Sequence, residues 1–471
     1  MTLSNRLFDE IAVGDRASTT RIVTPDDLFV FANVSGNLNP LNLPPMPGGR
    51  DADDGVAAAP SMWVGSLFSA VLGNLLPGPG TVYEAQSLRF HERAQIGDEL
   101  TVSVEVVERR APATIVLATR VERAGVLIAD GVAEVRAPGE RRTVNDVTPP
   151  NLVVARHANM KRMLDACAGL PALPTAVVAP EEENALLGAL AGGRERLITP
   201  ILIGDEAKIR ALAKSLGADL DGVAIEHAAS HDAAAARAVE LVTQGRAKAI
   251  MKGHLHSDEL LRHVVKSQGG LRTGRRISHV FVMDAPSLPN LLLVTDAAIN
   301  IAPTLEEKVD IVQNAIDLGR ALGLKKPKVG ILSAVELVNP KMQSTLDAAA
   351  LSKMSERGQI TGGVVDGPLA MDNAISVSAA RTKGLTSLVA GRADVLVAPN
   401  LESGNILAKE LTYAAQAEGA GLVLGAKAPV MLTSRADDEG SRLFSCAVAV
   451  LYAHWLETGE TAVTAAPEAG E

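Results

Sequence analysis

The hydrophobic pattern of the chain changes near residue 145, and this change most constrains its fold. Before it, the segments TVYEAQSLRF, ELTVSVEVVERR, ATIVLATRVERA and VLIADGVAEVRA alternate apolar and polar residues. A period of two is typical of antiparallel strands with one face in water. After it, short β-branched runs such as TAVVAP and TPILIG alternate with segments of helical spacing. Strands buried on both faces form parallel sheets through right-handed crossovers, so the sequence predicts two unlike domains.

Length and charge set the outer bounds. The 471 residues exceed one ordinary core and indicate about three compact units. A net charge of -10 disfavours nucleic acid or an anionic membrane as the main partner. Any phosphate-binding site must therefore be local.

Cysteine usage and apolar runs favour a cytoplasmic protein. Cys167 and Cys446 are the only cysteines, so we expect no disulfide framework and no metal site. The apolar run from Leu443 to Leu456 contains His454 and is shorter than the roughly 18 residues of a membrane span. We therefore expect no membrane partner.

Residues 1–145 are predicted to form an α+β domain around one buried helix. The segment from Ser61 to Leu75, SMWVGSLFSAVLGNL, is apolar on nearly every side, so we expect it to be enclosed. A buried helix wrapped by a curled antiparallel sheet is the hot-dog arrangement. The stretch around Pro149-Pro150 is interpreted as the linker that follows.

The loop SGNLNPLN, from Ser35 to Asn42, precedes this helix. Together with FDEIAVGD, LPGPGTVYEAQSLRF and GDELTVSVEV, it makes residues 8–140 resemble the MaoC-like (R)-specific enoyl-CoA hydratases. That family has Asp-x-Asn-Pro-x-His in the loop, and the resemblance implies that Asn37 and Asn42 replace the catalytic Asp and His. An amide cannot accept a proton near neutral pH, so we expect a hydratase-inactive domain.

Two further observations bear on this loop. Pro60-Ser61-Met62 stands where the family usually has His-Gly-Met. The competing interpretation of SGNLNPLN is an ordinary turn-rich loop, because Asn, Gly and Pro dominate turns.

Residues 155–471 are predicted to form a two-lobed α/β domain. TAVVAP, TPILIG, GVAIEH and AKAIMKG form a first strand series, and NLLLVTDAAIN, KVGILSAVE, GGVVDGPLA, ADVLVAPN and APVMLTSRA form a second. Two α/β sheets with a cleft between them are the simplest arrangement. Lobe one would comprise about 155–293 plus 436–471, and lobe two about 294–435.

Motifs along roughly residues 155–465 resemble the phosphate acetyltransferase and phosphate butyryltransferase family. In order they are MKGHLHSDELLRHV, VFVMDAP, VTDAAINIAPTLEEKVDIVQNA, LSAVELVNPKMQSTLDAAAL, ITGGVVDGPLAMDNAIS, ADVLVAPNLESGNILAKEL and APVMLTSRADD. The resemblance implies transfer of an acyl group, preferably acetyl, between coenzyme A and phosphate. It also implies a bilobed fold like that of isocitrate and isopropylmalate dehydrogenases. The whole chain resembles fused MaoC-type and phosphate acetyltransferase proteins.

Ser434 and Arg435 are the first catalytic candidates. LTSRADD directly follows the run APVM, which places both residues at the carboxyl end of a strand, where open α/β sheets bind ligands. The family carries its Ser-Arg pair at this motif. The resemblance therefore implies that Ser434 donates to the phosphate or oxyanion and that Arg435 clamps an anion. The alternative is a turn with a solvated Arg.

The base that deprotonates the coenzyme A thiol is an open question in the sequence. The acetyltransferase branch has an Asp seven residues after the Ser, whereas this chain has Ser441. Asp437 and Asp438 are nearby alternatives. A free thiol has a pKa near 8.5, so a weak base or cationic surroundings would suffice.

Further anion-binding candidates come from loops. Arg272, Arg275 and Arg276 form a Gly-bounded basic cluster in GGLRTGRRISH, and Lys252 ends the strand AKAIMK. A charge cluster is usually solvated surface, yet in an acidic chain it is the best local phosphate site.

Three asparagines complete the predicted site: Asn300, Asn373 and Asn405 lie in motifs that approach the ligand in the family. Each is equally suited to a turn or a helix N-cap. His254 and His256, spaced i, i+2, suit a loop or helix entry better than a metal.

We interpret the chain as a cytoplasmic, homo-oligomeric phosphate acyltransferase. Coenzyme A is its substrate, and we expect no tightly bound cofactor and no metal. The amino-terminal domain is expected to sense acyl-CoA or to support assembly. Three alternatives stay open: a truly bifunctional hydratase and acetyltransferase, an NAD-dependent decarboxylating dehydrogenase-like enzyme of the same bilobed fold, and a non-catalytic acyl-CoA-binding protein.

Overall fold

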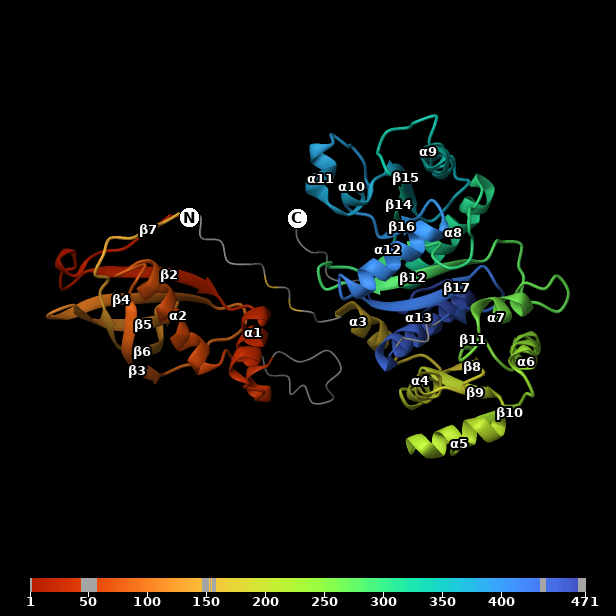
Figure 1. The fold of residues 1–471 in the computed structure, drawn as a ribbon, viewed down its shortest axis with the longest axis horizontal. Helices are drawn as coiled ribbons and strands as arrows, with labels where there is room; N and C mark the ends of the chain where they lie inside the picture. Colours follow the sequence, from red (N-terminus) through yellow and green to blue (C-terminus); the bar gives the residue numbers. More distant parts are fainter. Residues whose placement is uncertain are drawn as a thin grey trace. The chain divides into compact units, whose positions relative to one another are not determined.

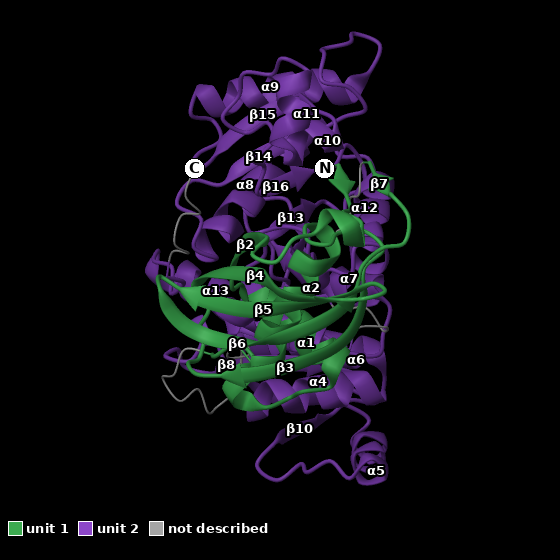
Figure 2. Cartoon of the chain, turned by 90° about the vertical axis from the view of Figure 1, so that its left-hand side faces the viewer, with its two compact units in different colours: residues 1–154 green, residues 155–471 purple. Residues whose placement is uncertain are grey.

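The structure, a computed structural model, describes residues 2–43, 57–145, 152, 154, 158–432 and 438–464. Contacts divide the chain into two compact units, residues 1–154 and 155–471, which Figure 2 colours separately. Among the described residues, no helix is both long and apolar enough to cross a membrane.

Unit 1 is a five-stranded antiparallel sheet with α2 (Ser61–Asn74) packed against it. The strand order is β2 (Arg16–Ile22), β4 (Glu99–Arg110), β5 (Thr114–Arg123), β6 (Val126–Arg136) and β3 (Val82–Phe90). Figure 2 shows these strands as one curved sheet. A short ribbon, β1 (Leu3–Ser4) with β7 (Thr143–Val144), joins the two ends of the unit.

The core of unit 1 explains why this helix and this sheet associate. Phe68, Val71 and Leu72 of α2 are at most 1% exposed. Leu100 and Val102 are buried at alternate positions of β4, as its period of two predicts. The predicted helix is therefore present, but the expectation that it is enclosed is wrong, because one face packs on the sheet while Ser61, Met62, Ser66, Ser69, Ala70 and Asn74 are exposed. The arrangement of helix and sheet is that of a hot-dog fold.

Helix α1 (Pro25–Ser35) positions the asparagine loop. Thr24 caps its start, where Thr24 and Asp27 form a capping box, and Pro25 occupies the first helical position. Gly36 ends it with a left-handed φ of 70°, a conformation that glycine adopts without steric cost. The turn η2 (Pro40–Asn42) follows.

The described residues of unit 2 form one mixed sheet of eleven strands (Figure 1). The spatial order is β10 (Ala224–His227), β9 (Ile198–Gly204), β8 (Leu173–Val178), β11 (Ala249–Lys252), β18 (Val430–Met431), β17 (Glu418–Leu424), β12 (Ser278–Asp284), β13 (Leu292–Thr295), β16 (Val395–Val397), β14 (Lys328–Leu332) and β15 (Val364–Leu369).

The expectation of two separate sheets is wrong. β17 pairs antiparallel with both β18 and β12 and so joins the two strand series into one sheet. Hydrophobic runs show that a strand exists, but they do not show its partner, and β12 and β17 are far apart in the chain. β17 and β18, which the sequence-based lobes placed with residues 294–435, lie between β11 and β12.

Helices cover both faces of this sheet (Figure 1). They are α3 (Ala158–Ala166), α4 (Glu183–Arg194), α5 (Glu206–Leu216), α6 (His231–Thr243), α7 (Ser257–Val264), α8 (Leu305–Ala321), α9 (Gln343–Glu356), α10 (Met371–Ile375), α11 (Val377–Thr382), α12 (Leu401–Tyr413) and α13 (Glu439–Thr458). On one face, α3, α4, α5, α8, α9 and α13 share one continuous apolar core with the central strands. On the other face the core is split, with α6 and α7 over one part and α10, α11 and α12 over the other.

Strand direction defines two edges of this sheet. β8, β9, β10, β11, β18 and β12 run one way, whereas β13, β14, β15, β16 and β17 run the other. One edge therefore carries Lys252, Asp284 and Glu418, and we name it the Lys252 edge. The opposite edge carries Asp296 after β13 and Gly425 after β17, and we name it the Asp296 edge. β12, seven residues long, spans roughly 20 Å between them.

Candidate functional site

Three of the four predicted catalytic residues, Ser434, Arg435 and Asp437, lie outside the described residues. Their neighbours are described. Leu432 follows β18 at the Lys252 edge, and Asp438 is the N-cap of α13. Asp438 Oδ1 accepts a hydrogen bond from the backbone N–H of Ser441 at 2.9 Å. One oxygen of the Asp438 carboxylate is thus engaged in capping α13, a role that Asp performs well.

Lys252 lies at the end of β11 and is 5% exposed. Its Nζ approaches the carbonyl oxygen of Gly253 at 3.5 Å. His254 follows, with its backbone N–H bound to the carbonyl of Ala179, and His256 is the N-cap of α7. These histidines therefore occupy the loop and helix entry that their sequence positions suggested.

The three arginines of GGLRTGRRISH lie at the opposite, Asp296 edge. Arg272 pairs with Ala426 through a backbone bridge, and its exposed side chain makes no ion pair with another described residue. The Arg275 guanidinium binds Asp317 on α8. The backbone N–H of Arg275 binds Thr273 Oγ1 at 3.1 Å, and Thr273 in turn donates to the carbonyl of Gly425.

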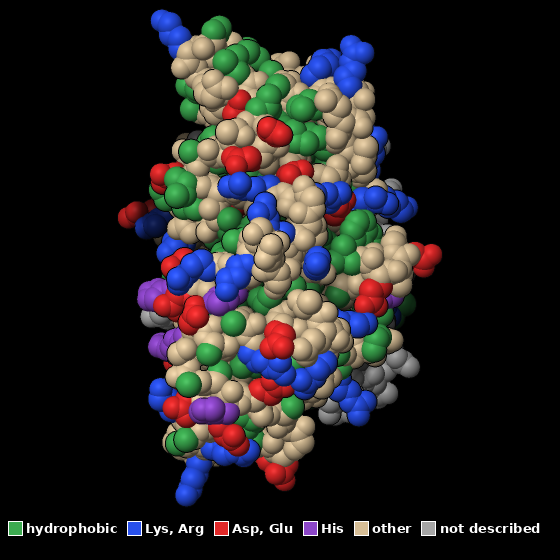
Figure 3. All heavy atoms as spheres, turned by 90° about the vertical axis from the view of Figure 1, so that its right-hand side faces the viewer, with side chains coloured by type: hydrophobic (Ala, Val, Ile, Leu, Met, Phe, Trp, Pro, Cys, Tyr) green, Lys and Arg blue, Asp and Glu red, His purple; other side chains and the backbone are tan. Residues whose placement is uncertain are grey.

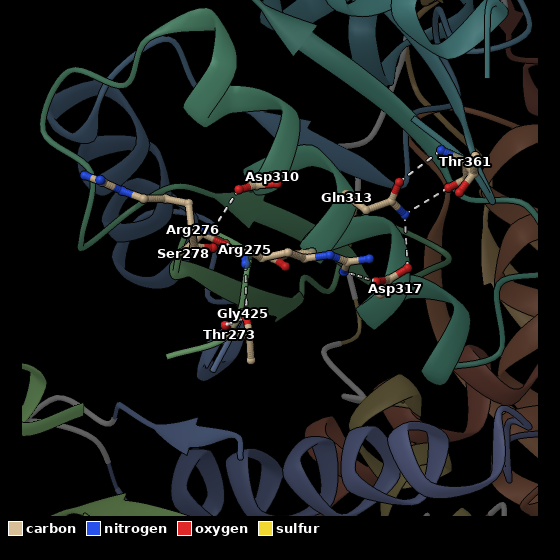
Figure 4. Close-up of polar contacts among 10 residues, drawn as sticks. Thr273, Arg275, Arg276, Ser278, Asp310, Gln313, Asp317, Thr361 and Gly425 are labelled. Atoms are coloured by element: carbon tan, nitrogen blue, oxygen red, sulfur yellow. Dashed lines mark hydrogen bonds and ion pairs between the residues drawn. The ribbon is translucent and has the colours of Figure 1, made fainter. Parts of the chain in front are cut away.

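The side chains of Arg275 and Arg276 point in opposite directions, as Figure 4 shows. Arg276 Nη1 lies 2.9 Å from a carboxylate oxygen of Glu307, and its Nε donates to Asn300 Oδ1 at 2.8 Å. Its backbone N–H donates to Asp310 at 2.7 Å. Carboxylates of α8 thus neutralise Arg275 and Arg276, and Arg272 keeps its charge unpaired within the described chain. On the face of the molecule that Figure 3 shows, Lys and Arg side chains are interspersed with Asp and Glu side chains.

Asn300 and Asn405 hold the turn after β13. Asp296 Oδ1 accepts from the backbone N–H groups of Ala298 and Ile299 at 2.9 and 3.0 Å. Asn300 Nδ2 donates to the carbonyl of Ile277 at 2.9 Å. Asn405 Nδ2 donates to the carbonyl of Ala297 at 3.0 Å. Both amides therefore have a structural use at the Asp296 edge.

Asn373 differs from these two asparagines. It lies on α10, is fully buried, and neither of its side-chain amide atoms has a hydrogen-bond partner among the described residues. Leaving a buried amide unsatisfied costs about 1–3 kcal/mol. Asn373 is therefore the predicted asparagine whose side chain remains without a structural role.

His279 is a buried polar residue that the sequence reasoning missed. It lies on β12, both ring nitrogens are without a partner among the described residues, and its ring meets that of Phe281 edge-on at 4.5 Å. Burial lowers the pKa of His279 to about 4, although the nearby charge of Asp296 acts to raise this pKa. A histidine within an apolar run, SHVFVMD, was the available signal.

The two cysteines are not suited to nucleophilic chemistry. Cys167 and Cys446 are free thiols that are both buried. Burial raises the pKa of each thiol to about 12, so neither forms a thiolate near neutral pH. Among the described residues, no group of three or more His, Cys, Asp and Glu side chains is placed to hold a metal ion.

In unit 1, the two predicted replacement asparagines have backbone hydrogen-bond partners. Asn37 Oδ1 accepts from the backbone N–H of Asn39 at 3.1 Å, and Asn42 Nδ2 donates to the carbonyl of Ala58 at 2.9 Å. Pro60 precedes α2 without a side-chain cap, and Ser61 is exposed at the first helical position. The described part of this loop, residues 35–43, holds no titratable side chain.

The predicted residues of unit 2 therefore fall into two groups. Lys252 and Asp438 lie at the Lys252 edge, whereas Arg272, Arg275, Arg276 and Asn300 lie at the Asp296 edge. A site that used both groups would have to accommodate a ligand long enough to extend along the central strands.

Known proteins match both units. Residues 229–450 match the family model described as Phosphate acetyl/butaryl transferase. A phosphate acetyltransferase of Rhizobium meliloti is 55% identical over 299 residues, which cover 64% of this chain and 95% of that protein. The crystal structure of a branched-chain phosphotransacylase from Enterococcus faecalis aligns with a TM-score of 0.53 and 31% identity, over 60% of this chain and 99% of that one.

For unit 1, the R-hydratase PhaJ1 from Pseudomonas aeruginosa is 35% identical, covers 33% of this chain and 99% of its own, and gives a TM-score of 0.31. The hot-dog arrangement of unit 1 rests instead on its own helix and sheet. For unit 2, the high identity extends over nearly the full length of the Rhizobium protein. The chain therefore belongs to the phosphate acetyl/butaryl transferase family.

Proposed function

We propose that unit 2 is an acyltransferase that interconverts acyl-CoA plus phosphate with acyl phosphate plus coenzyme A, with acetyl preferred. The observation that carries the proposal is 55% identity to a phosphate acetyltransferase over 95% of that protein. The reaction needs a thiolate, a phosphate site and donors for the oxyanion that forms as sulfur attacks the carbonyl. Coenzyme A is a substrate here, and the proposal includes no resident cofactor.

Ser434 and Arg435 take the central roles in this proposal. Ser434 donates to the phosphate or the oxyanion, and Arg435 binds the anion through its planar guanidinium. The described elements on either side support these roles. β18 ends at Met431 and α13 begins at Glu439, so both residues belong to the connection from the end of a strand to the start of a helix. The first turn of a 20-residue helix favours negative charge nearby.

The remaining candidate binding residues are ranked by whether their side chains already have an ion-pair or hydrogen-bond partner in the described structure. Among the loop arginines, Arg272 is the preferred anion contact, because Arg275 and Arg276 already bind Asp317 and Glu307. Asn373 is preferred over Asn300 and Asn405, since only its amide has no partner in the described structure. Lys252 contributes a buried positive charge at the other edge.

Unit 1 is proposed to sense acyl-CoA or to support assembly, without hydrating a double bond. Its loop from Ser35 to Leu43 lacks a group that accepts a proton near neutral pH. We also propose that the two halves of the large sheet act as lobes, as in isocitrate and isopropylmalate dehydrogenases. A homo-oligomer in the cytoplasm completes the proposal, and two buried free thiols fit a reducing compartment.

A thiol-release assay tests the proposal. Purified protein is mixed with phosphate and, in turn, acetyl-, propionyl- and butyryl-CoA, and free coenzyme A is measured. We expect release with all three and the fastest release with acetyl-CoA. Absence of release with every acyl-CoA, together with reduction of NAD by a hydroxy acid, would replace the proposal with the dehydrogenase alternative.

A further inference from the structure

The group that takes the thiol proton can be sought among the carboxylates of the Lys252 edge. Among the described carboxylates of this edge, four lie near the end of β18 or the start of α13: Asp284, Glu418, Asp438 and Glu439. Glu418 begins β17 and is the register partner of Asp284, which ends β12. β17 also pairs with β18, so Glu418 lies on the strand next to the one that leads to Ser434.

Three of these four carboxylates are committed elsewhere. Asp284 is 3% exposed, and its two oxygens accept from Asn159 Nδ2 at 3.0 Å and from the backbone N–H of Met160 at 2.7 Å. Asp438 caps α13. Glu439 is exposed and lies 3.4 Å from Arg194.

Glu418 has a different environment. Its Oε2 accepts a hydrogen bond from the hydroxyl of Ser441 at 3.1 Å, and it makes no ion pair with another described residue. Both side chains are half-buried. Ser441 lies in the first turn of α13, which packs along β17 (Figure 1). Hence a carboxylate and a hydroxyl meet at the N-terminus of α13, the helix that follows Ser434 in the chain.

We propose that Glu418 is the base of acyl transfer and acts through the hydroxyl of Ser441. This inference rests on the function proposed above. As coenzyme A approaches, Ser441 Oγ accepts the S–H proton and passes its own hydroxyl proton to Glu418 Oε2. The sulfur electron pair forms the new C–S bond, the tetrahedral oxyanion collapses, and the C–O bond breaks so that phosphate leaves with its electron pair. In the reverse direction, protonated Glu418 returns the proton to the departing thiolate.

The start of α13 is a favourable place for the negative charge that develops on the coenzyme A sulfur. The thiolate would form beside the first turn of α13, where the helix dipole and free N–H groups favour an anion. Glu418 would be neutral once it holds the proton, so it would not repel the thiolate. The neighbouring charged groups are Asp284 on β12, Asp438 and Glu439 at the start of α13, the buried Arg442 that follows Ser441, and Arg194 on α4.

The test measures kcat/KM for coenzyme A, with acetyl phosphate as acyl donor, as a function of pH. Glu418→Gln should lower kcat/KM about 100-fold at pH 7, the usual contribution of a general base. The loss should shrink as the pH approaches about 8.5, because the free thiol then ionises without help. Ser441→Ala should lose less than Glu418→Gln, since a water molecule can bridge the gap.

A second substitution separates catalysis from folding. In the Glu418→Gln background, Ser441→Asp places a carboxylate on α13 itself and should raise kcat/KM about tenfold. Glu439→Gln, an exposed change in the same helical turn, is the matched control and should match the unmodified protein. Thermal melting of each variant checks that the fold is kept.

The outcomes discriminate between the two proposals. Full activity of Glu418→Gln, or a loss that is the same at every pH, overturns the role of Glu418 and leaves acyl transfer intact. A Ser441→Asp change that fails to rescue the Glu418→Gln variant also contradicts the proton path. Inactivity of the unmodified protein with every acyl phosphate overturns both proposals together.

Discussion

The asparagine loop of unit 1 and the polar edges of unit 2 use polar residues in different ways. In unit 1, Asn37 and Asn42 bind only backbone groups, of Asn39 in the same loop and of Ala58 before α2, and the loop has no titratable group in its described part. In unit 2, carboxylates, arginines and asparagines are joined by contacts between distant elements, such as Arg275 with Asp317 and Asn159 with Asp284. A polar loop can thus keep its shape without keeping proton chemistry, whereas a working site needs charge held at fixed places.

The largest expected effect concerns the independence of the two units. Phe68 is fully buried at the centre of the unit 1 core, so Phe68→Ala should destabilise that unit by about 3–5 kcal/mol. Acyl transfer by unit 2 should be unchanged. Calorimetric melting followed by the thiol assay checks both statements. Met62→Ala on the same helix is the control, because Met62 is 60% exposed. A matching loss of acyl transfer would show that the units depend on each other.

A second prediction concerns Ser434 and Arg435. Ser434→Ala and Arg435→Ala should each lower kcat about 100-fold to 1,000-fold, because each removes a contact to negative charge in the transition state. Melting temperature should stay the same. Arg194→Ala removes an exposed arginine that pairs with Glu439 and serves as a control. Near-normal kinetics of both variants would favour the turn interpretation of TSRADD.

A third and smaller effect is the pH dependence caused by His279. The pKa of His279 is lowered from 6.5 to about 4 in the folded protein, so the unfolded chain binds the proton first as the pH falls. Stability should therefore decrease by roughly 1–3 kcal/mol between pH 6.5 and pH 4. Denaturant unfolding at several pH values measures this decrease. His279→Leu should flatten the profile over that window, and an unchanged slope would contradict the assignment.

The sequence predicted the elements of the fold better than their pairing. The period of two in β4 and the apolar run from Ser61 identified the sheet and the helix of unit 1, since both patterns are local, although the helix is buried on one face only. The β-branched runs likewise identified most strands of unit 2, but β12 and β17 were not among the predicted strands. Joining of the two strand series through β17 could not be predicted, because antiparallel pairing of β12 with β17 leaves no mark in either run.

The candidate site was predictable only in part, for a related reason. A motif names residues such as Arg275 and Arg276, but their binding to Asp317 and Glu307 depends on how α8 packs, which the motif does not contain. Glu418 was missed because it belongs to no catalytic pattern and meets Ser441 only through the packing of β17 against α13. Asn373 lay in a recognised motif, yet its unpaired amide is visible only in the structure.

One measurement tests the contrast between the two units most directly. The same preparation is incubated with crotonyl-CoA alone and with acetyl-CoA plus phosphate, and both the hydrated product and free coenzyme A are measured. The contrast predicts release of coenzyme A from acetyl-CoA and no hydration of crotonyl-CoA. Hydration of crotonyl-CoA, or failure to release coenzyme A from acetyl-CoA in the presence of phosphate, would contradict it.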